Sequence, residues 1–129
     1  MSESIVAKKS YVFALTVVKL CQDLFEQKEF VLSRQLLKSG TSIGANVEEA
    51  LAAQSRKDFI SKMSIASKEA RETLYWLRLL RDSNIVRDDA VGEVTKEAES
   101  LARMLTSIVK TTRESQTALN NSKLKTRNS

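Results

Sequence analysis

The chain has 129 residues, the size of one ordinary domain, and its 42% hydrophobic and 29% charged residues are typical of a globular protein. It contains no proline and only three glycines, which favours long helices over a sheet with many turns. With no histidine and one cysteine, Cys21, the chain excludes the common zinc sites, histidine acid–base catalysis and an intramolecular disulfide. The formal charge of +5 is concentrated at one end: residues 1–99 hold 15 Lys/Arg and 15 Asp/Glu, and residues 100–129 hold six against one.

Helical periodicity begins in residues 4–27, where apolar residues form two adjacent rows. The two rows together cover more than half of a helix circumference, more than one core-facing stripe needs. This helix is therefore expected to be deeply buried or to touch more than one neighbour. The rows are Tyr11, Leu15, Val18, Cys21 and Phe25, and Phe13, Val17, Leu20 and Leu24.

A break at Gln27–Glu29 precedes a second helix, predicted over residues 30–54, whose apolar face includes Gly40 and Gly44. These glycines indicate close helix packing or a kink. The alternative, a phosphate-binding glycine loop, lacks the strand before it and the Lys-Ser/Thr after it. The apolar stripe comprises Leu32, Leu36, Ile43, Val47, Ala50 and Leu51.

The third helix is predicted over residues 56–82, with Ser55 as its N-cap and Asp58 in its first turn. Besides a core stripe of Phe59, Met63, Ala66, Ala70, Leu74 and Leu77, it carries a second apolar row. A lone bundle needs one stripe per helix, so the surplus row predicts self-association; the alternative is that a loop or tail of the same chain covers it. The row comprises Ile65, Trp76 and Leu79, with Tyr75 at its margin.

The fourth helix is predicted over residues 88–115, after a turn at Asp82–Asn84, and its stripe runs from Ala90 to Thr112. Four helices joined by short links predict an all-α, antiparallel up-down-up-down four-helix bundle over residues 1–115. Residues 116–129 are polar and basic, and a frayed, flexible tail is expected there.

A basic ridge is predicted on the outer face of the fourth helix, where cations recur every seven residues. Concentrated positive charge suits phosphate-backbone binding, whereas the alternative is an ordinary solvated face that Glu99 and Glu114 partly neutralise. No aromatic residue interleaves these cations, so base stacking gains no support. The candidate nucleic-acid-binding residues are Lys96, Arg103, Lys110 and Arg113, with Lys123, Lys125 and Arg127 in the tail.

Polar residues near the middle of the second and third helices do not form a recognisable catalytic or metal site. A di-iron bundle needs Glu-x-x-His pairs, which a chain without histidine cannot supply. Asn46 is interpreted as a hydrogen-bonding side chain, and Glu72 as the partner of an arginine. No catalytic residue, metal or cofactor is predicted.

The segment from Leu36 to Leu80 resembles the small four-helix-bundle proteins encoded within intervening sequences of large-subunit ribosomal RNA genes. The accessory protein of diversity-generating retroelements belongs to the same broad family. The matching positions are Ser42, Ile43, Asn46, Val47 and Glu49, then Ser55, Lys57, Phe59, Glu72 and Leu74. The resemblance implies a homo-oligomeric ring, typically a pentamer, and for the retroelement relative a basic surface that engages nucleic acid and a reverse transcriptase.

These observations predict a non-enzymatic, ring-forming accessory protein that associates with RNA or DNA, with a reverse transcriptase as a further possible partner. The alternative is a protein–protein interaction scaffold that binds no nucleic acid. Because the N-terminus lacks the order of a signal peptide and the apolar run Tyr11–Val18 is too short to cross a bilayer, a cytoplasmic location is expected.

Overall fold

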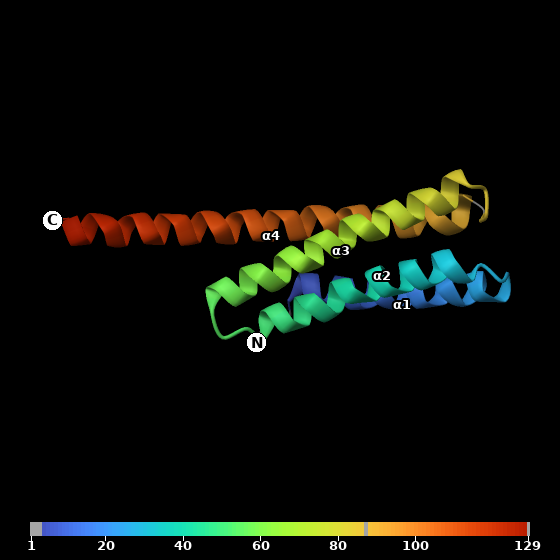
Figure 1. Cartoon of the computed structure of the whole chain (residues 1–129), viewed down its shortest axis with the longest axis horizontal. Coiled ribbons are helices and arrows are strands. Elements are labelled where there is room, and N and C mark those ends of the chain that lie inside the picture. Colours follow the sequence, from blue (N-terminus) through green and yellow to red (C-terminus); the bar gives the residue numbers. More distant parts are fainter. Residues whose placement is uncertain (1–3, 87, 129) are drawn as a thin grey trace.

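The computed structural model describes residues 4–86 and 88–128, with side chains described throughout these ranges except at residues 88 and 126–128. It contains α1 (Ile5–Glu26), α2 (Phe30–Leu51), α3 (Arg56–Asp82) and α4 (Asp88–Asn128). Successive helices run antiparallel in an up-down-up-down arrangement (Figure 1). The predicted all-α four-helix bundle is therefore confirmed, and α2 ends slightly before the predicted position.

Local chemistry sets the ends of the helices. The Ser4 and Ser55 hydroxyls cap α1 and α3 by accepting hydrogen bonds from the backbone N–H groups of Ala7 and Asp58, at 3.3 and 3.1 Å. Lys28 and Asn84 adopt left-handed backbone conformations with φ of 63° and 59° in the turns after α1 and α3. The predicted break at Gln27–Glu29, the turn at Asp82–Asn84 and the N-cap at Ser55 are all confirmed.

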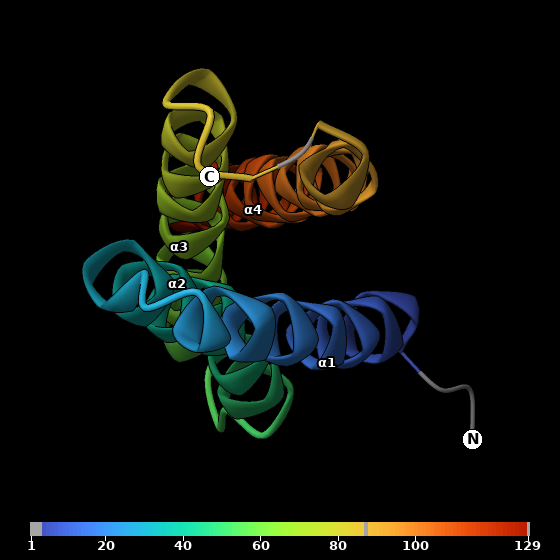
Figure 2. The ribbon, with the colours of Figure 1, turned by 90° about the vertical axis from the view of Figure 1, so that its right-hand side faces the viewer.

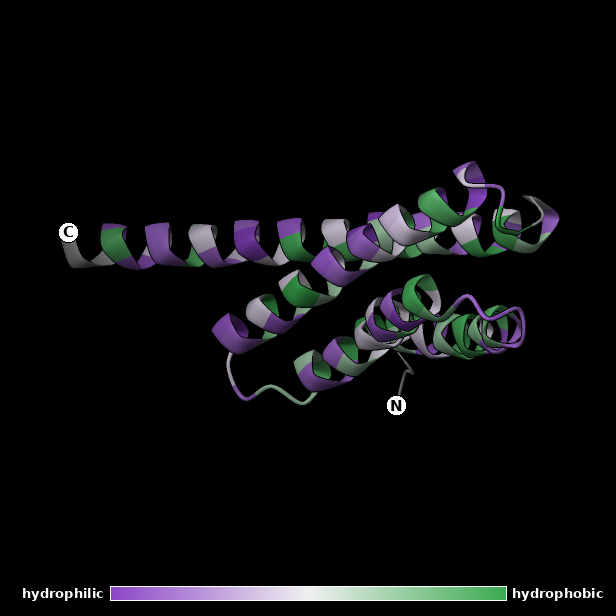
Figure 3. Ribbon diagram, turned by 45° about the vertical axis from the view of Figure 1, so that its right-hand side comes forward, coloured by the Kyte–Doolittle hydropathy of each residue, from purple (hydrophilic) through white to green (hydrophobic). Residues whose placement is uncertain are grey.

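Each helix packs against its neighbours in the sequence, and α4 returns to α1 to close the bundle. The α1–α4 contact is the smallest of the four. Figure 2, a view from one end, shows α4 almost along the line of sight, with α1 and α3 inclined to it. The core lies along the inward faces, where hydrophobic segments of the ribbon in Figure 3 gather.

Only one of the two apolar rows of α1 belongs to this core. Phe13, Val17, Leu20 and Leu24 are buried, as is Cys21 from the other row. The rest of that other row is exposed. The prediction that Leu51 belongs to the apolar core face of α2 is wrong. Leu51 is 49% exposed, near the C-terminal end of that helix.

Gly40 lies where α1 and α2 approach each other closely. A Cβ atom at this position would lie 2.8 Å from Val17 Cγ1, closer than two carbon atoms can pack. At Gly44 the corresponding atom would lie 3.4 Å from the Ser10 carbonyl oxygen. The interpretation of these glycines as packing residues is confirmed at Gly40 by this distance.

The predicted end of the fourth helix near residue 115 is wrong, because α4 continues as one helix to Asn128. Its C-terminal part projects beyond the other helices (Figure 1), and described side chains from Thr117 to Lys125 are exposed. The predicted end of the helix was taken from the end of its apolar stripe. Polar residues such as Gln116 and Lys123 are nevertheless compatible with a helix that has no packing partner. The division into bundle and tail stays a prediction.

Among the residues that the structure describes, no helix is both long and apolar enough to cross a membrane.

Candidate functional site

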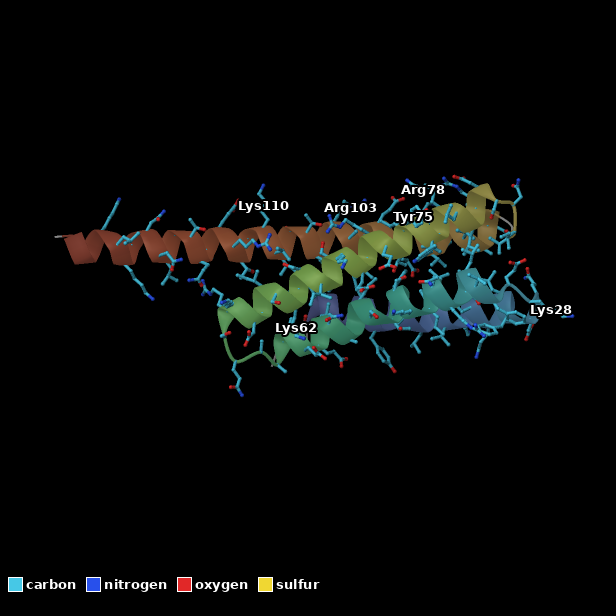
Figure 4. All side chains as sticks on the ribbon, in the orientation of Figure 1. Lys28, Lys62, Tyr75, Arg78, Arg103 and Lys110 are labelled. Carbon is cyan, nitrogen blue, oxygen red and sulfur yellow. The ribbon has the colours of Figure 1, made fainter. Side chains whose placement is uncertain are left out.

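The basic ridge lies on the solvent side of α4. Lys96, Arg103 and Lys110 are all exposed, and their seven-residue spacing places successive side chains about 10.5 Å apart along the helix. Figure 4 shows Arg103 and Lys110 on this helix, at the α3–α4 side of the molecule. Lys96 Nζ lies 3.9 Å from Glu93 Oε1 in a solvent-exposed pair, and Glu114 lies one helical turn beyond Lys110. Such a pair is weak, so the ridge keeps most of its positive field.

The other predicted cations fall into two groups. Arg113 turns toward α3, where its Nη2 donates a hydrogen bond of 3.2 Å to Ser64 Oγ. Lys123 and Lys125 are exposed on the projecting end of α4. The side chain of Arg127 lies outside the described residues. The structure therefore places these tail cations on the projecting helical end of α4.

A second set of cations on α3 was missed by sequence reasoning. Lys68, Arg71 and Arg78 are exposed, and their spacing puts them on one face of the helix together with Tyr75. The Arg78 guanidinium carbon lies 5.7 Å from the centre of the Tyr75 ring, within cation–π range. The spacing of positions 68, 71, 75 and 78 was the available signal. An aromatic residue does interleave cations, although on α3 rather than on α4.

Apolar side chains also gather on the outer flank of α1 and the adjoining edge of α2. Their exposed fractions reach 60% at Tyr11 and 52% at Leu15. The Phe25 and Phe30 rings pack together across the α1–α2 turn, with centres 5.5 Å apart. We call this surface the α1 apolar band; its members are Tyr11, Leu15, Val18, Phe25, Phe30 and Leu51.

The predicted association row of α3 is only partly at the surface. Ile65 and Tyr75 are 38% and 45% exposed. Trp76 and Leu79 are half-buried, and Trp76 packs against the core and edge-on against Tyr75. Trp76 Nε1 is buried and has no acceptor among the described residues. The surplus apolar surface is therefore larger on α1 than on α3.

The polar residues of α2 and α3 have local partners. Asn46 Nδ2 donates to the Ser42 carbonyl oxygen at 2.8 Å, which confirms its predicted hydrogen-bonding role. Glu49 pairs with Lys62 at 2.8 Å. Burial, and then the nearby charge of Glu72, raise the pKa of Glu69. The neighbour of Glu72 is thus Glu69, and the predicted arginine partner is not found among the described contacts.

Cys21 is buried between α1 and α2, where its Sγ donates to the Ser33 carbonyl oxygen at 3.3 Å. This burial raises the pKa of the thiol from 9.0 to about 11. A thiol of this kind stays protonated near neutral pH and is a packing group rather than a nucleophile.

The model of the 23S rRNA-intervening sequence protein family matches residues 2–107, which is most of the chain. The chain belongs to this family. The resemblance proposed from Leu36 to Leu80 is therefore confirmed for the intervening-sequence proteins, and the link to diversity-generating retroelements stays a prediction.

Among solved structures, this member of the 23S rRNA-intervening sequence protein family is similar to a protein from Bacteroides thetaiotaomicron VPI-5482. That protein is described as one of unknown function from the S23 ribosomal protein family. The two are 48% identical, the match covers 82% of this chain and 99% of the other, and the TM-score is 0.80. No curated protein matches the chain.

Proposed function

We propose that this chain is a non-enzymatic accessory protein that binds the phosphate backbone of RNA or DNA along α4 and assembles with copies of itself. The observation that carries the proposal is the exposed basic ridge of α4, in a chain that belongs to the 23S rRNA-intervening sequence protein family.

The electrostatic part of the proposal is supported by where the charge lies. All of the net charge falls in residues 100–129, and that segment is helical as far as Asn128. A helix presents its cations in a fixed row, so their entropy cost on binding is lower than in a disordered tail. Contacts from Lys and Arg to phosphates give affinity without sequence preference.

The assembly part is supported by two apolar surfaces on different helices. The α1 apolar band lies on α1 and α2, and the exposed part of the α3 row, Ile65 and Tyr75, lies on α3. Contact between two different surfaces is heterologous, and repeated heterologous contacts form a ring when the rotation between subunits closes and a filament when it does not. The pentamer that the resemblance implies is one such ring.

Nucleic-acid binding is tested by the anisotropy of a fluorescein-labelled 20-nucleotide single-stranded RNA, and of the DNA of the same sequence, titrated with protein. We expect affinity to fall steeply between about 50 and 200 mM salt. Reversal of the ridge in the triple variant Lys96→Glu, Arg103→Glu, Lys110→Glu should abolish binding. The matched control reverses three exposed cations of α1, Lys8, Lys9 and Lys19, and should retain more of the affinity. Absence of RNA and DNA binding by the wild-type chain at 50 mM salt would contradict the proposal.

Self-association is tested by light scattering on Leu15→Lys, because Leu15 is in the α1 apolar band and 52% exposed. We expect its mass to fall toward that of one subunit, with little change in thermal stability. Val31→Lys is the control, since Val31 is 73% exposed on α2 outside the band. Trp76→Ala is less informative, because Trp76 packs against the core and its loss would also leave a cavity. A wild-type mass of one subunit at micromolar concentration would contradict assembly.

The rival function is an interaction scaffold that never touches nucleic acid. It predicts that the ridge triple variant behaves as the wild type in every association assay. A reverse transcriptase as protein partner and a cytoplasmic location remain predictions from the resemblance and from the sequence.

A further inference from the structure

The α3–α4 side of the molecule contains a hollow of about 420 Å³ where the two helices diverge toward the projecting end of α4. Three cations line it: Arg71 from α3, and Lys110 and Arg113 from α4. Three hydroxyl groups, from Ser64, Ser67 and Thr106, line it as well. We call this hollow, with these six residues, the α3–α4 notch.

The notch is partly organised in the absence of any ligand. Ser67 Oγ and Thr106 Oγ1 lie 3.4 Å apart across the helix pair. Arg113 is drawn toward α3 by its 3.2 Å bond to Ser64, which uses one of the five N–H groups of a guanidinium. Two arginine forks and a lysine therefore converge from two helices on a space that hydroxyl groups also line.

This combination of groups fits a phosphate. A guanidinium matches the spacing of two phosphate oxygens, a lysine adds a compact charge, and hydroxyl groups donate to the remaining oxygen atoms. Glu114 also lines the notch, so three cations and one carboxylate give it a net charge of +2. That is enough to attract an anion, and Glu114 should weaken its binding.

The charged residues on the α4 wall of the notch lie outside the part of the chain that the family model matches, whereas Thr106 lies inside it. The model ends at residue 107, whereas Lys110, Arg113 and Glu114 follow it. Residues 2–107 hold 16 cationic and 15 acidic side chains, a net of +1, and residues 108–129 hold five and one, a net of +4. The notch thus joins family-matched residues of α3 to a basic continuation of α4.

We propose that the α3–α4 notch binds one phosphate group of a nucleic-acid backbone and so fixes the strand that follows the α4 ridge. Lys110 belongs to both the ridge and the notch, which makes the two surfaces continuous. The inference rests on the proposed function, and it adds Arg71, Ser64, Ser67 and Thr106 to the residues that contact the ligand.

The test compares two double variants that lose the same charge, with the labelled single-stranded RNA as probe. Arg71→Gln with Arg113→Gln removes the two guanidinium groups of the notch, and Lys8→Gln with Lys19→Gln removes two exposed cations of α1. We expect the notch variant to lose at least tenfold in affinity at 100 mM salt and the α1 variant less than threefold. Thermal melting should show both variants folded, because all four side chains are exposed.

Glu114→Gln should raise the affinity for the RNA, an effect that would not arise if the notch residues had only a structural role. We expect its affinity for the RNA to rise severalfold, whereas Glu97→Gln, on the α1-facing side of α4, should change it less than twofold. Equal losses in the two double variants together with no gain in Glu114→Gln would overturn the notch and leave nucleic-acid binding by α4 intact. Failure of the wild-type chain to bind RNA or DNA would overturn both.

Discussion

The α1–α2 pair and the α3–α4 pair join their helices by different means. Between α1 and α2, Gly40 lets the helices approach until no space remains for a methyl group beside Val17. Between α3 and α4, hydroxyl and guanidinium groups meet across the pair, as in the Arg113–Ser64 bond, and a hollow remains. Close packing makes the first pair intolerant of added atoms at Gly40, whereas the hollow of the second pair is lined by cations that suit an anionic ligand.

The largest expected effect is that of Gly40→Ala on stability, because it adds a methyl group between α1 and α2. The new methyl group would lie 2.8 Å from Val17 Cγ1, and a β-branched side chain in a helix has few other rotamers. Overpacking typically costs 1–3 kcal/mol, which outweighs the roughly 1 kcal/mol gained from better helix propensity. We expect a net loss of up to about 2 kcal/mol in the free energy of unfolding, measured by urea denaturation.

Gly92→Ala is the matched control, because among the described residues no atom outside its own stretch of helix backbone lies within 4 Å of the corresponding position in α4. It should stabilise the protein by up to about 1 kcal/mol. The double variant Gly40→Ala, Val17→Ala should recover part of the loss. Equal effects at Gly40 and Gly92 would show that the α1–α2 approach is looser than described.

The pH dependence of stability should reveal the burial of the Cys21 thiol between α1 and α2. Burial raises the pKa of this thiol from 9.0 to about 11, so the unfolded chain ionises first as pH rises. The contribution of the thiol is fully present below pH 9 and is lost as the pH approaches 11. We expect the wild type to lose roughly 1–2 kcal/mol more than Cys21→Ala over this interval.

Urea denaturation at several pH values between 8 and 11 gives the free energy of unfolding of each protein. The slopes of this free energy against pH are then compared between the wild type and Cys21→Ala. Absolute stability is not compared, because the alanine variant also leaves a cavity. Parallel slopes for the two proteins would contradict the buried thiol.

The α3–α4 pair should respond mildly to Ser67→Ala. Ser67 is 8% exposed, and its hydroxyl lies 3.4 Å from that of Thr106. A hydrogen bond of this kind contributes about 0.5–1 kcal/mol net, and the free Thr106 hydroxyl can turn to water. Ser107→Ala, an exposed position on α4, is the control and should have no measurable effect in the same urea assay. A loss above about 2 kcal/mol would indicate that the two pairs are equally tightly packed.

Periodicity and capping were sufficient to predict the four helices, because the apolar stripes and Ser55 are local signals. The end of α4 was missed because its last part has no packing partner, and an apolar stripe is then no guide to helix length. The two rows of α1 were seen, but which row faces the core depends on where α2 and α4 lie. The row that contains Val17 is the buried one, and Gly40 of α2 leaves the space that the Val17 side chain fills.

The candidate site was predictable only along single helices. Lys96, Arg103 and Lys110 form a ridge by their spacing on α4 alone. Arg71 could not be joined to Arg113 from the sequence, because 42 residues separate them and their meeting depends on the register of α3 against α4.

The smallest expected effect concerns Glu69, at the edge where α3 meets α2 and so between the two pairs. Burial, and then the charge of Glu72, raise its pKa, while Lys68 and Lys38 oppose the shift. The folded chain therefore binds a proton at Glu69 more readily than the unfolded chain, and stability from this group rises as pH falls through the raised pKa.

Glu69→Gln should stabilise the protein at pH 7 by about 0.5 kcal/mol or less, the size of a like-charge pair on a helix. Because the wild-type carboxyl group is protonated at pH 3, the advantage should vanish there. An equal gain from Glu69→Gln at both pH values would assign the effect to packing and leave the Glu69–Glu72 repulsion without a role.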